Sequence, residues 1–294
     1  MSPAASPKPG PAPSRSGREA GGADQRALFP LACRWLPPEV ADNYRILGAY
    51  AAALRAVADH PALEPARKEE RLKALAGVLQ GQSAAEGIDA GLRAALNLRH
   101  LLESRGLDVQ DPWQMLQAAG LDATKSRYPD WSDLLAWCRY WAAPVGRMAY
   151  RFAGGGGAGL EAAESFAVGA EILYLVEQAP AHQRWLGRVY LPERWFRDAE
   201  CDPAELSAAR SSPGLKRVIA RAAGEALRLV EHGSAARGDF PGRRLRIAAA
   251  TAEAEVRAWA RCLVRGDSLA GPLRPGTGAG FAIRIAGLAR GFLG

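Results

Sequence analysis

The stretch DATKSRYPDWSDLLAWCRYWAAPVGRMAYRFAGG, residues 122–155, mixes cationic and aromatic side chains over one loop and one helix. Its charged members include Asp122, Lys125, Arg127, Arg139 and Arg147. Arginine binds phosphate groups and aromatic rings favour a nearby positive charge, so such a face suits a ligand with a diphosphate head and a carbocation tail. The alternative is an Arg-rich face in solvent with the Trp side chains in the core, and the spacing alone favours this alternative.

Helical periodicity extends from this stretch in both directions along the chain. Apolar residues recur at the spacing of one helix face in the segments 43–60, 66–81, 161–178, 212–233 and 242–266. No convincing run alternates with period two, as a half-buried strand would. There is no internal repeat and no clear linker between the helices, so the sequence predicts one all-α domain, over residues 26–275.

The two ends of the chain differ from this domain. Residues 1–25 have five prolines in the first 13 positions and no apolar core, so we expect a disordered tail rather than a signal peptide. Residues 276–294 place Phe281, Ile285 and Leu288 on one helical stripe with arginines nearby. This amphipathic segment either packs onto the bundle, which is the favoured alternative, or docks at a membrane surface.

Composition excludes several classes of function. The net charge is +7, but the cations are spread along the chain beside 31 acidic residues, so a nucleic-acid partner is not expected. No stretch of about 18 apolar residues is present to span a bilayer. We expect a cytoplasmic protein, either free or peripheral at the inner face of the membrane. Cysteines and histidines are dispersed and predict free thiols and no zinc site; they are Cys33, Cys138, Cys201 and Cys262, and His60, His100, His182 and His232.

The stretch 122–155 resembles the hallmark DATKxRYxDWxDLxxYCRYSAxPVGR of the squalene/phytoene synthase family, and within it the hydroxysqualene synthase branch. The likeness extends from Phe29 to about Arg274. The other matching segments are LFPLACRWLPPEV (28–40), DHPALEPARKEERL (59–72), GRVYLPERW (187–195) and RRLRIAAA (243–250). The resemblance implies the isoprenoid-synthase fold, a helical bundle with a central cavity.

The family's chemistry depends on two aspartate-rich motifs that face each other across that cavity. Their carboxylates hold Mg²⁺ ions, which bind the diphosphate and help it to leave as a stabilised anion. Some members join two farnesyl diphosphates, and the hydroxysqualene branch ionises presqualene diphosphate and adds water. The resemblance therefore implies prenyl diphosphate substrates and Mg²⁺ as cofactor.

The first of these motifs, DDxAD, falls on RAVAD, residues 55–59. Arg55 and Ala56 replace the first two acids, and only Asp59 is retained. Arg55 either pairs directly with diphosphate in place of a metal or is a surface or salt-bridged arginine on an amphipathic helix, and the two alternatives stand about even.

The second motif, DxxxD, falls either on Gln178 and His182 or on Ala179 and Gln183. Neither register keeps a carboxylate. The family's upstream asparagine and glutamine are also replaced, near Glu171 and Tyr174, and Trp137 stands where a tyrosine is common. Asp59 and Glu177 are the remaining candidates for holding one weakly bound Mg²⁺.

The candidate catalytic residues are accordingly Asp59, Arg55 and His182, of which His182, at the edge of a loop, is more simply interpreted as solvated. The candidate diphosphate-binding residues that the resemblance implies are Tyr50, Arg127, Arg139, Arg147, Arg188 and Tyr190.

Three hypotheses of function follow. The favoured one is a protein that has lost Mg²⁺-dependent ionisation and binds a prenyl diphosphate or prenyl lipid, or forms a hetero-oligomer with an active paralogue. The second is an active prenyl transferase with a rearranged diphosphate site and a Mg²⁺ cofactor. The third is an assembly factor that reuses the fold and binds no prenyl lipid.

Overall fold

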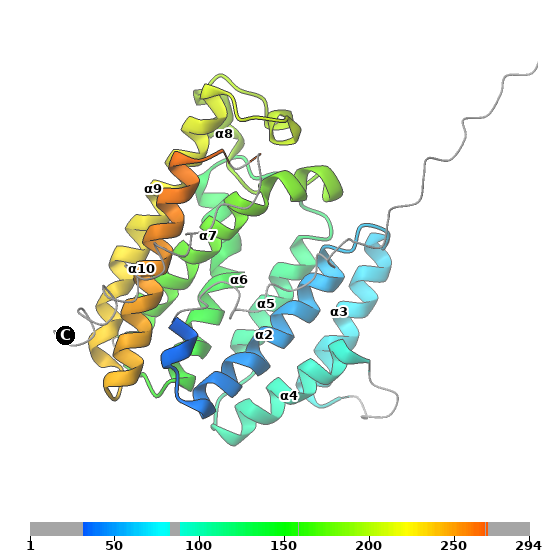
Figure 1. Cartoon of the computed structure of the whole chain (residues 1–294). Helices are drawn as coiled ribbons and strands as arrows, with labels where there is room; N and C mark the ends of the chain where they lie inside the picture. Colours follow the sequence, from blue (N-terminus) through cyan, green and yellow to red (C-terminus); the bar gives the residue numbers. More distant parts are fainter. Residues whose placement is uncertain (1–31, 83–88, 158, 268, 270–294) are drawn as a thin grey trace, which may run out of the picture.

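The computed structural model describes residues 32–82, 89–157, 159–267 and 269, and it shows a helical bundle (Figure 1). The principal helices are α2 (Pro38–Ala58), α3 (Pro65–Gln80), α4 (Ala90–Ser104), α5 (Gln110–Leu121), α6 (Trp131–Phe152), α7 (Gly159–Leu186), α8 (Glu193–Asp198), α9 (Pro213–Gly233) and α10 (Arg243–Arg265). Short 3-10 helices lie at η1 (Ala32–Trp35), η2 (Pro203–Ser207) and η3 (Ser234–Asp239). The predicted all-α, single-domain fold is confirmed.

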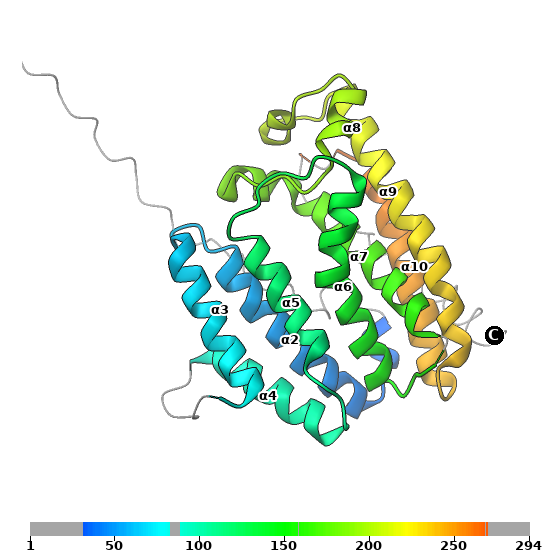
Figure 2. The same ribbon diagram turned by 180° about the vertical axis from the view of Figure 1, so that it is seen from behind.

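Helices α6 and α7 form the middle of the bundle. Helices α2 to α5 lie on one side of them, and α9 and α10 lie on the other (Figures 1 and 2). Helix α7 packs against both α6 and α9, which explains why its sequence is apolar on most sides.

Two glycines allow the central helices to approach closely. A Cβ on Gly146 of α6 would lie 2.5 Å from the carbonyl oxygen of Ala163 in α7. A Cβ on Gly169 of α7 would lie 2.6 Å from the carbonyl oxygen of Ala226 in α9. Because both obstacles are backbone atoms, any larger residue would push the helices apart.

The helix boundaries follow local sequence signals. Asp130 begins α6 as its N-cap and forms a capping box with Asp133, and Ser212 caps α9 ahead of Pro213. The segments predicted as helices near 43–60, 66–81, 212–233 and 242–266 correspond to α2, α3, α9 and α10. Helix α7 extends beyond the predicted 161–178 and continues through Pro180 to Leu186, so the second motif lies within it.

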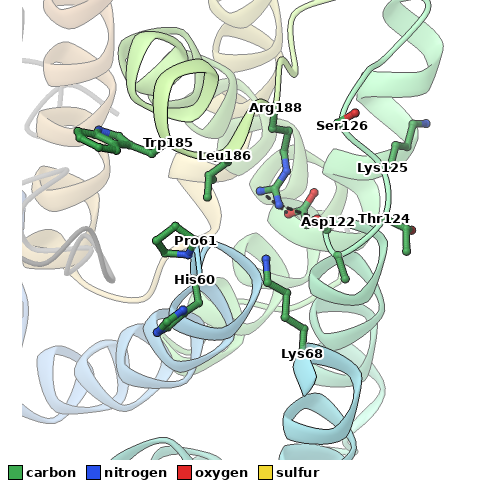
Figure 3. A pocket seen from close by; sticks show the side chains of 11 residues that line it. His60, Pro61, Lys68, Asp122, Thr124, Lys125, Ser126, Trp185, Leu186 and Arg188 are labelled. Carbon is green, nitrogen blue, oxygen red and sulfur yellow. Dashed lines mark hydrogen bonds and ion pairs between the residues drawn. The ribbon is translucent and has the colours of Figure 1, made fainter. Parts of the chain in front are cut away.

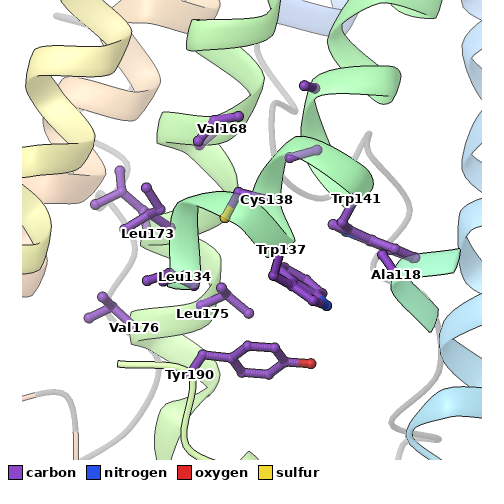
Figure 4. Close-up of a cluster of buried hydrophobic side chains, with 14 of the residues drawn as sticks. Ala118, Leu134, Trp137, Cys138, Trp141, Val168, Leu173, Leu175, Val176 and Tyr190 are labelled. Carbon is purple, nitrogen blue, oxygen red and sulfur yellow. The ribbon is translucent and has the colours of Figure 1, made fainter. Parts of the chain in front are cut away.

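The main core lies around α6 and α7. Trp137 and Trp141 of α6 stack with ring centroids 5.9 Å apart, next to apolar side chains of α7 (Figure 4). Tyr190, from the loop after α7, packs against Trp137 at 4.8 Å between ring centroids. The core therefore reaches into the loop that carries the RVYLP sequence.

That loop runs beside the loop that precedes α6. The amide of Val189 donates to the carbonyl of Ser126 at 2.9 Å, and the amide of Glu193 donates to the carbonyl of Tyr128 at 2.9 Å. An isolated bridge pairs Arg127 with Val189, and the described part of the chain has no β-strand. The two sequence motifs that carry the family resemblance are thus held side by side.

Three sequence predictions fall outside the described residues or remain open. The tail at 1–25 and the amphipathic segment at 276–294 lie outside the described ranges. A central cavity that could hold a prenyl chain stays a prediction. Within the described ranges, no helix is both long enough and apolar enough to cross a membrane.

Candidate functional site

Arg55, at the first position of the degraded DDxAD motif, points into the bundle rather than into solvent. Its guanidinium forms an ion pair with Glu171 of α7, and the two side chains are only 12% and 11% exposed. The guanidinium carbon lies 4.4 Å from the ring centroid of Trp141 and 4.7 Å from that of Tyr174. Of the alternative that Arg55 is a surface or salt-bridged arginine, the salt bridge is confirmed and the surface position is wrong.

The charge of Arg55 is retained inside the bundle. Burial alone would lower the pKa of the guanidinium, but the Glu171 carboxylate, with smaller contributions from Tyr174 and Asp59, raises that pKa above its ordinary value. An arginine cation with its carboxylate and two aromatic faces thus forms a neutral, enclosed unit.

Asp59, the one acid retained from the first motif, is engaged by Arg188 of the RVYLP loop. The Arg188 Nη1 donates to the Asp59 carboxylate at 2.6 Å and to the Tyr190 hydroxyl at 3.0 Å. Its Nη2 donates to the backbone carbonyl of Asp122 at 2.6 Å. Asp59 is the C-cap residue of α2, so this pair fastens the end of α2 to both motif loops.

Asp122 completes this cluster from the loop before α6. Its carboxylate accepts a hydrogen bond from the Tyr190 hydroxyl at 2.8 Å and one from the Tyr128 hydroxyl at 3.4 Å. Burial raises the pKa of the Asp122 carboxyl to about 7, and the cation of Arg188 opposes that shift. The carboxyl is thus partly protonated near neutral pH.

The positions of the second motif line the interior part of α7. Ala179 and His182 are buried, and Gln178 and Gln183 are partly buried. The expectation that His182 is solvated at a loop edge is wrong, because α7 continues past it and its ring packs edge-on against Tyr190 at 5.3 Å. Burial lowers the pKa of the His182 imidazole to about 4, so the ring is neutral at pH 7.

Some buried polar atoms around Tyr190 lack partners. His182 Nδ1, Gln183 Oε1 and Trp137 Nε1 have no hydrogen-bond partner among the described residues. The rings of His182 and Trp137 both contact Tyr190, so at least two of these atoms belong to one region. Buried polar groups normally find partners, so this region suits a polar ligand group or bound water.

A Mg²⁺ cluster does not fit the residues at the two motif positions. Such a cluster needs several carboxylate oxygens, whereas Arg55 places a cation at the first position and the Asp59 carboxylate is already paired with Arg188. Glu177 is partly buried on α7, where its charge acts on Tyr174. Across the described ranges, no group of three or more His, Cys, Asp or Glu side chains could hold a metal ion.

The structure brings some of the other predicted residues to this cluster and keeps others away. Arg188 and Tyr190 lie at its centre. Arg127 ties the two motif loops together by donating to the carbonyl of Gly187. Tyr50 is buried and donates to the Pro112 carbonyl at 3.0 Å, which joins α2 to α5.

Arg139, Arg147 and Ala56 are placed differently from what the sequence suggested. Arg139 is exposed on α6, and Ala56 is exposed on α2. Arg147 pairs with Asp111 at 2.6 Å and with Glu164 at 3.0 Å, so its charge is used to join α5, α6 and α7. The described contacts give none of these three a link to Asp59 or Arg188.

Sequence reasoning did not assign several members to the site, although Glu171 and Tyr174 were noted as replaced family positions and Asp122 as a charged residue of the 122–155 stretch. Trp141, Tyr174 and Glu171 enclose Arg55, but the sequence gives no signal that pairs residues from α2, α6 and α7. Asp122 was visible in the DATKxRY stretch, and its position in that motif is the signal that could have found it.

A sequence model of the squalene/phytoene synthase family matches residues 24–273. The chain belongs to the squalene/phytoene synthase family. It is 29% identical over 191 residues to a hydroxysqualene synthase from Rhodopseudomonas palustris, which covers 65% of this chain and 63% of the relative. It is 30% identical over 181 residues to one from Sinorhizobium fredii, covering 61% of this chain and 59% of the relative. The matches thus span less than two thirds of the length of these relatives.

The fold agrees with this membership. The structure resembles a squalene synthase from Alicyclobacillus acidocaldarius with a TM-score of 0.67 and 20% identity, covering 83% of this chain and 89% of that chain. The helical bundle is therefore consistent with membership of the squalene/phytoene synthase family.

Proposed function

We propose that this family member binds a prenyl diphosphate, or a prenyl lipid derived from one, without Mg²⁺-dependent ionisation. The observation that carries the proposal is the ion pair of Arg55 with Glu171 inside the bundle, at the place of an expected metal-binding carboxylate. A second ion pair, of Arg188 with Asp59, supports it.

The electrostatic reason is simple. Mg²⁺ requires a surplus of negative oxygen ligands, and the two ion pairs cancel the charge of the carboxylates that face them. A divalent cation placed there would also be repelled by two buried guanidinium groups. Losing the metal cluster removes the main stabilisation of a departing diphosphate, which costs several orders of magnitude in rate.

Binding is supported by the chemistry of the interior. Trp137, Trp141 and Tyr174 place aromatic rings in this interior, and the unpartnered atoms at His182, Gln183 and Trp137 are available for hydrogen bonds to a polar group. Apolar walls with a few polar groups are typical of sites for small molecules.

In this role the protein would work beside an active paralogue, by holding or passing on a prenyl intermediate. Copurification of the two chains would test a hetero-oligomer. Contact with the inner face of the membrane, where prenyl lipids partition, belongs to the same proposal.

The experiment is equilibrium binding of farnesyl diphosphate, followed by tryptophan fluorescence, in EDTA and again with Mg²⁺. The proposal predicts binding in EDTA that Mg²⁺ changes little, with intact ligand recovered afterwards. The same titration compares Arg55→Met with a matched control, Arg45→Met. Arg45 is an exposed arginine of α2 that pairs with Asp42. Binding that appears only with Mg²⁺, or no binding at all, would contradict the proposal.

A further inference from the structure

A small polar pocket lies where the end of α7 meets the start of α3 and the loop before α6 (Figure 3). Its volume is about 170 Å³, which is below the roughly 300 Å³ of sites for drug-sized ligands. None of the six replaced motif positions lines it; they are Arg55, Ala56, Gln178, Ala179, His182 and Gln183. The pocket lies beside the retained acid of the first motif, because Arg188 lines it and pairs with Asp59, and it is sized for a head group.

Lys68 is the residue that makes this pocket unusual. Its side chain reaches from the first turn of α3 towards Arg188 and Asp122 (Figure 3), and the residue is 8% exposed. The ammonium donates one hydrogen bond, to the carbonyl of Ala58 at 2.8 Å. Because an ammonium has three N–H donors, two remain without a partner among the described residues.

The neighbouring charges favour an anion beside Lys68. Burial and the nearby Arg188 cation lower the pKa of the Lys68 ammonium, and Asp59 and Asp122 only partly oppose this. The terminal N–H groups of Arg188 donate to Asp59, Tyr190 and two backbone carbonyls. Arg188 therefore keeps its positive charge but has no terminal N–H group left for a ligand. Lys68 thus lies near a second buried cation, and a further anionic group beside Lys68 would lower the cost of burying both.

The remaining charged groups at the pocket do not use the free donors of Lys68. The Lys125 ammonium is turned away from Lys68 (Figure 3) and lies 3.5 Å from Asp133. The Asp59 carboxylate is paired with Arg188, and the Asp122 carboxyl accepts hydrogen bonds from the hydroxyls of Tyr190 and Tyr128, so neither is bonded to Lys68. A group with several anionic oxygens is the ligand that would satisfy the free donors of Lys68.

We infer that this pocket binds a phosphate or diphosphate group without any metal ion, with the Lys68 ammonium as its main ligand. Two kinds of ligand carry such a group: a free phosphate compound and the head group of an anionic lipid. The inference concerns the head group alone and holds whether or not the bundle takes a prenyl chain.

Inorganic diphosphate titrated into the protein in EDTA, followed by calorimetry, tests the first source. Vesicles of phosphatidylglycerol, compared with vesicles of phosphatidylcholine, test the second by cosedimentation. The key variant is Lys68→Met. The matched control is Lys73→Met, because Lys73 lies on the same helix, is 75% exposed at its side chain and pairs only with Glu69 in the described contacts.

We expect inorganic diphosphate to bind about tenfold more weakly to Lys68→Met, since a charge-assisted hydrogen bond is lost, and equally to Lys73→Met. Binding only to the phosphatidylglycerol vesicles, lost in Lys68→Met and kept in Lys73→Met, supports the same pocket with a lipid head group. No binding of either probe, or equal weakening in both variants, overturns the inference.

A second variant covers the case in which Lys68→Met does not fold. Thr124→Glu places a negative charge on an exposed residue at the edge of the pocket and removes no buried group. It should also weaken binding, and unchanged binding in a folded Thr124→Glu protein would overturn the inference. Because the probes carry no prenyl chain, their outcome is independent of whether farnesyl diphosphate binds.

Discussion

Arg188 donates a hydrogen bond of 2.6 Å to Asp59, a residue 129 positions earlier in the chain. This pair joins the end of α2 to the loop after α7, and the carboxylate that the resemblance assigns to a metal serves a guanidinium instead. The Arg188 side chain is only 4% exposed, and that of Asp59 is 14% exposed.

Breaking this pair should destabilise the protein. Asp59→Ala leaves the Arg188 cation buried without its carboxylate, so we expect the free energy of unfolding to fall by about 3 kcal/mol. Urea denaturation followed by circular dichroism measures it. The control is Asp198→Ala, which breaks an exposed pair with Arg221 and should cost less than about 1 kcal/mol. Equal costs for the two variants would mean that the Asp59 pair is not buried as described.

The pair of Arg55 and Glu171 makes a related prediction. Arg55→Met and Glu171→Leu should each cost about 3 kcal/mol, because each leaves one buried charge alone. The double variant should recover most of that loss, since replacing a buried ion pair by apolar side chains is often neutral or stabilising. Additive losses in the double variant would show that the two residues do not interact.

The pKa of His182 predicts a stability change with pH. Folding lowers this pKa from 6.5 to about 4, so the unfolded state takes up a proton first as the pH falls. The contribution of the neutral, buried ring to stability is therefore present above pH 6.5. As the pH falls from 6.5 to 4.5, the free energy of unfolding should decrease by about 2 kcal/mol. Subtracting the unfolding free energy of His182→Gln from that of the wild type at both pH values measures this contribution. A difference that does not change with pH would contradict it.

The stability contribution of Asp122 should change with pH in the opposite direction. Folding raises its pKa from 3.8 to about 7, so the folded state keeps a proton that the unfolded state releases. Its contribution is fully present below pH 3.8 and is lost as the pH rises towards 7. The free energy of unfolding of the wild type should therefore decrease relative to that of Asp122→Asn as the pH rises from 4.5 to 7. A wild type that gains stability relative to Asp122→Asn over this range would contradict the raised pKa.

The close contact of α6 with α7 predicts the effect of an added methyl group. Gly146→Ala should destabilise the protein by about 1–3 kcal/mol, because its Cβ would meet the Ala163 carbonyl. A Cβ added at Gly224 of α9 would have no atom within 4 Å. Gly224→Ala should therefore stabilise the protein by up to about 1 kcal/mol, because alanine has the higher helix propensity. Thermal unfolding of both variants tests the pair, and a neutral Gly146→Ala would contradict the packing.

Much of the fold was predictable from the sequence, and the reason is local. Apolar spacing in α2, α3, α9 and α10 and the cap signals at Asp130 and Ser212 act within a few residues, so they can be read along the chain. The extension of α7 past Pro180 was not predictable, because tertiary packing holds the helix together at a residue that normally ends one.

The site was predictable only in part. The motif positions of Arg188, Tyr190 and Asp59 marked residues that do meet. The enclosure of Arg55 by Trp141, Tyr174 and Glu171 depends on how three helices cross, and one sequence carries no record of those distances. Arg147 shows the converse. Its place in the motif predicted that it binds diphosphate, but its guanidinium forms ion pairs with Asp111 and Glu164.

Diphosphate release from farnesyl diphosphate and from presqualene diphosphate, with Mg²⁺ and with EDTA, tests the central claim most directly. The account predicts no Mg²⁺-dependent release from either substrate by protein that circular dichroism shows to be folded. Release that requires Mg²⁺ and disappears in Asp59→Ala would show that the site still assembles a metal centre, and it would contradict the account.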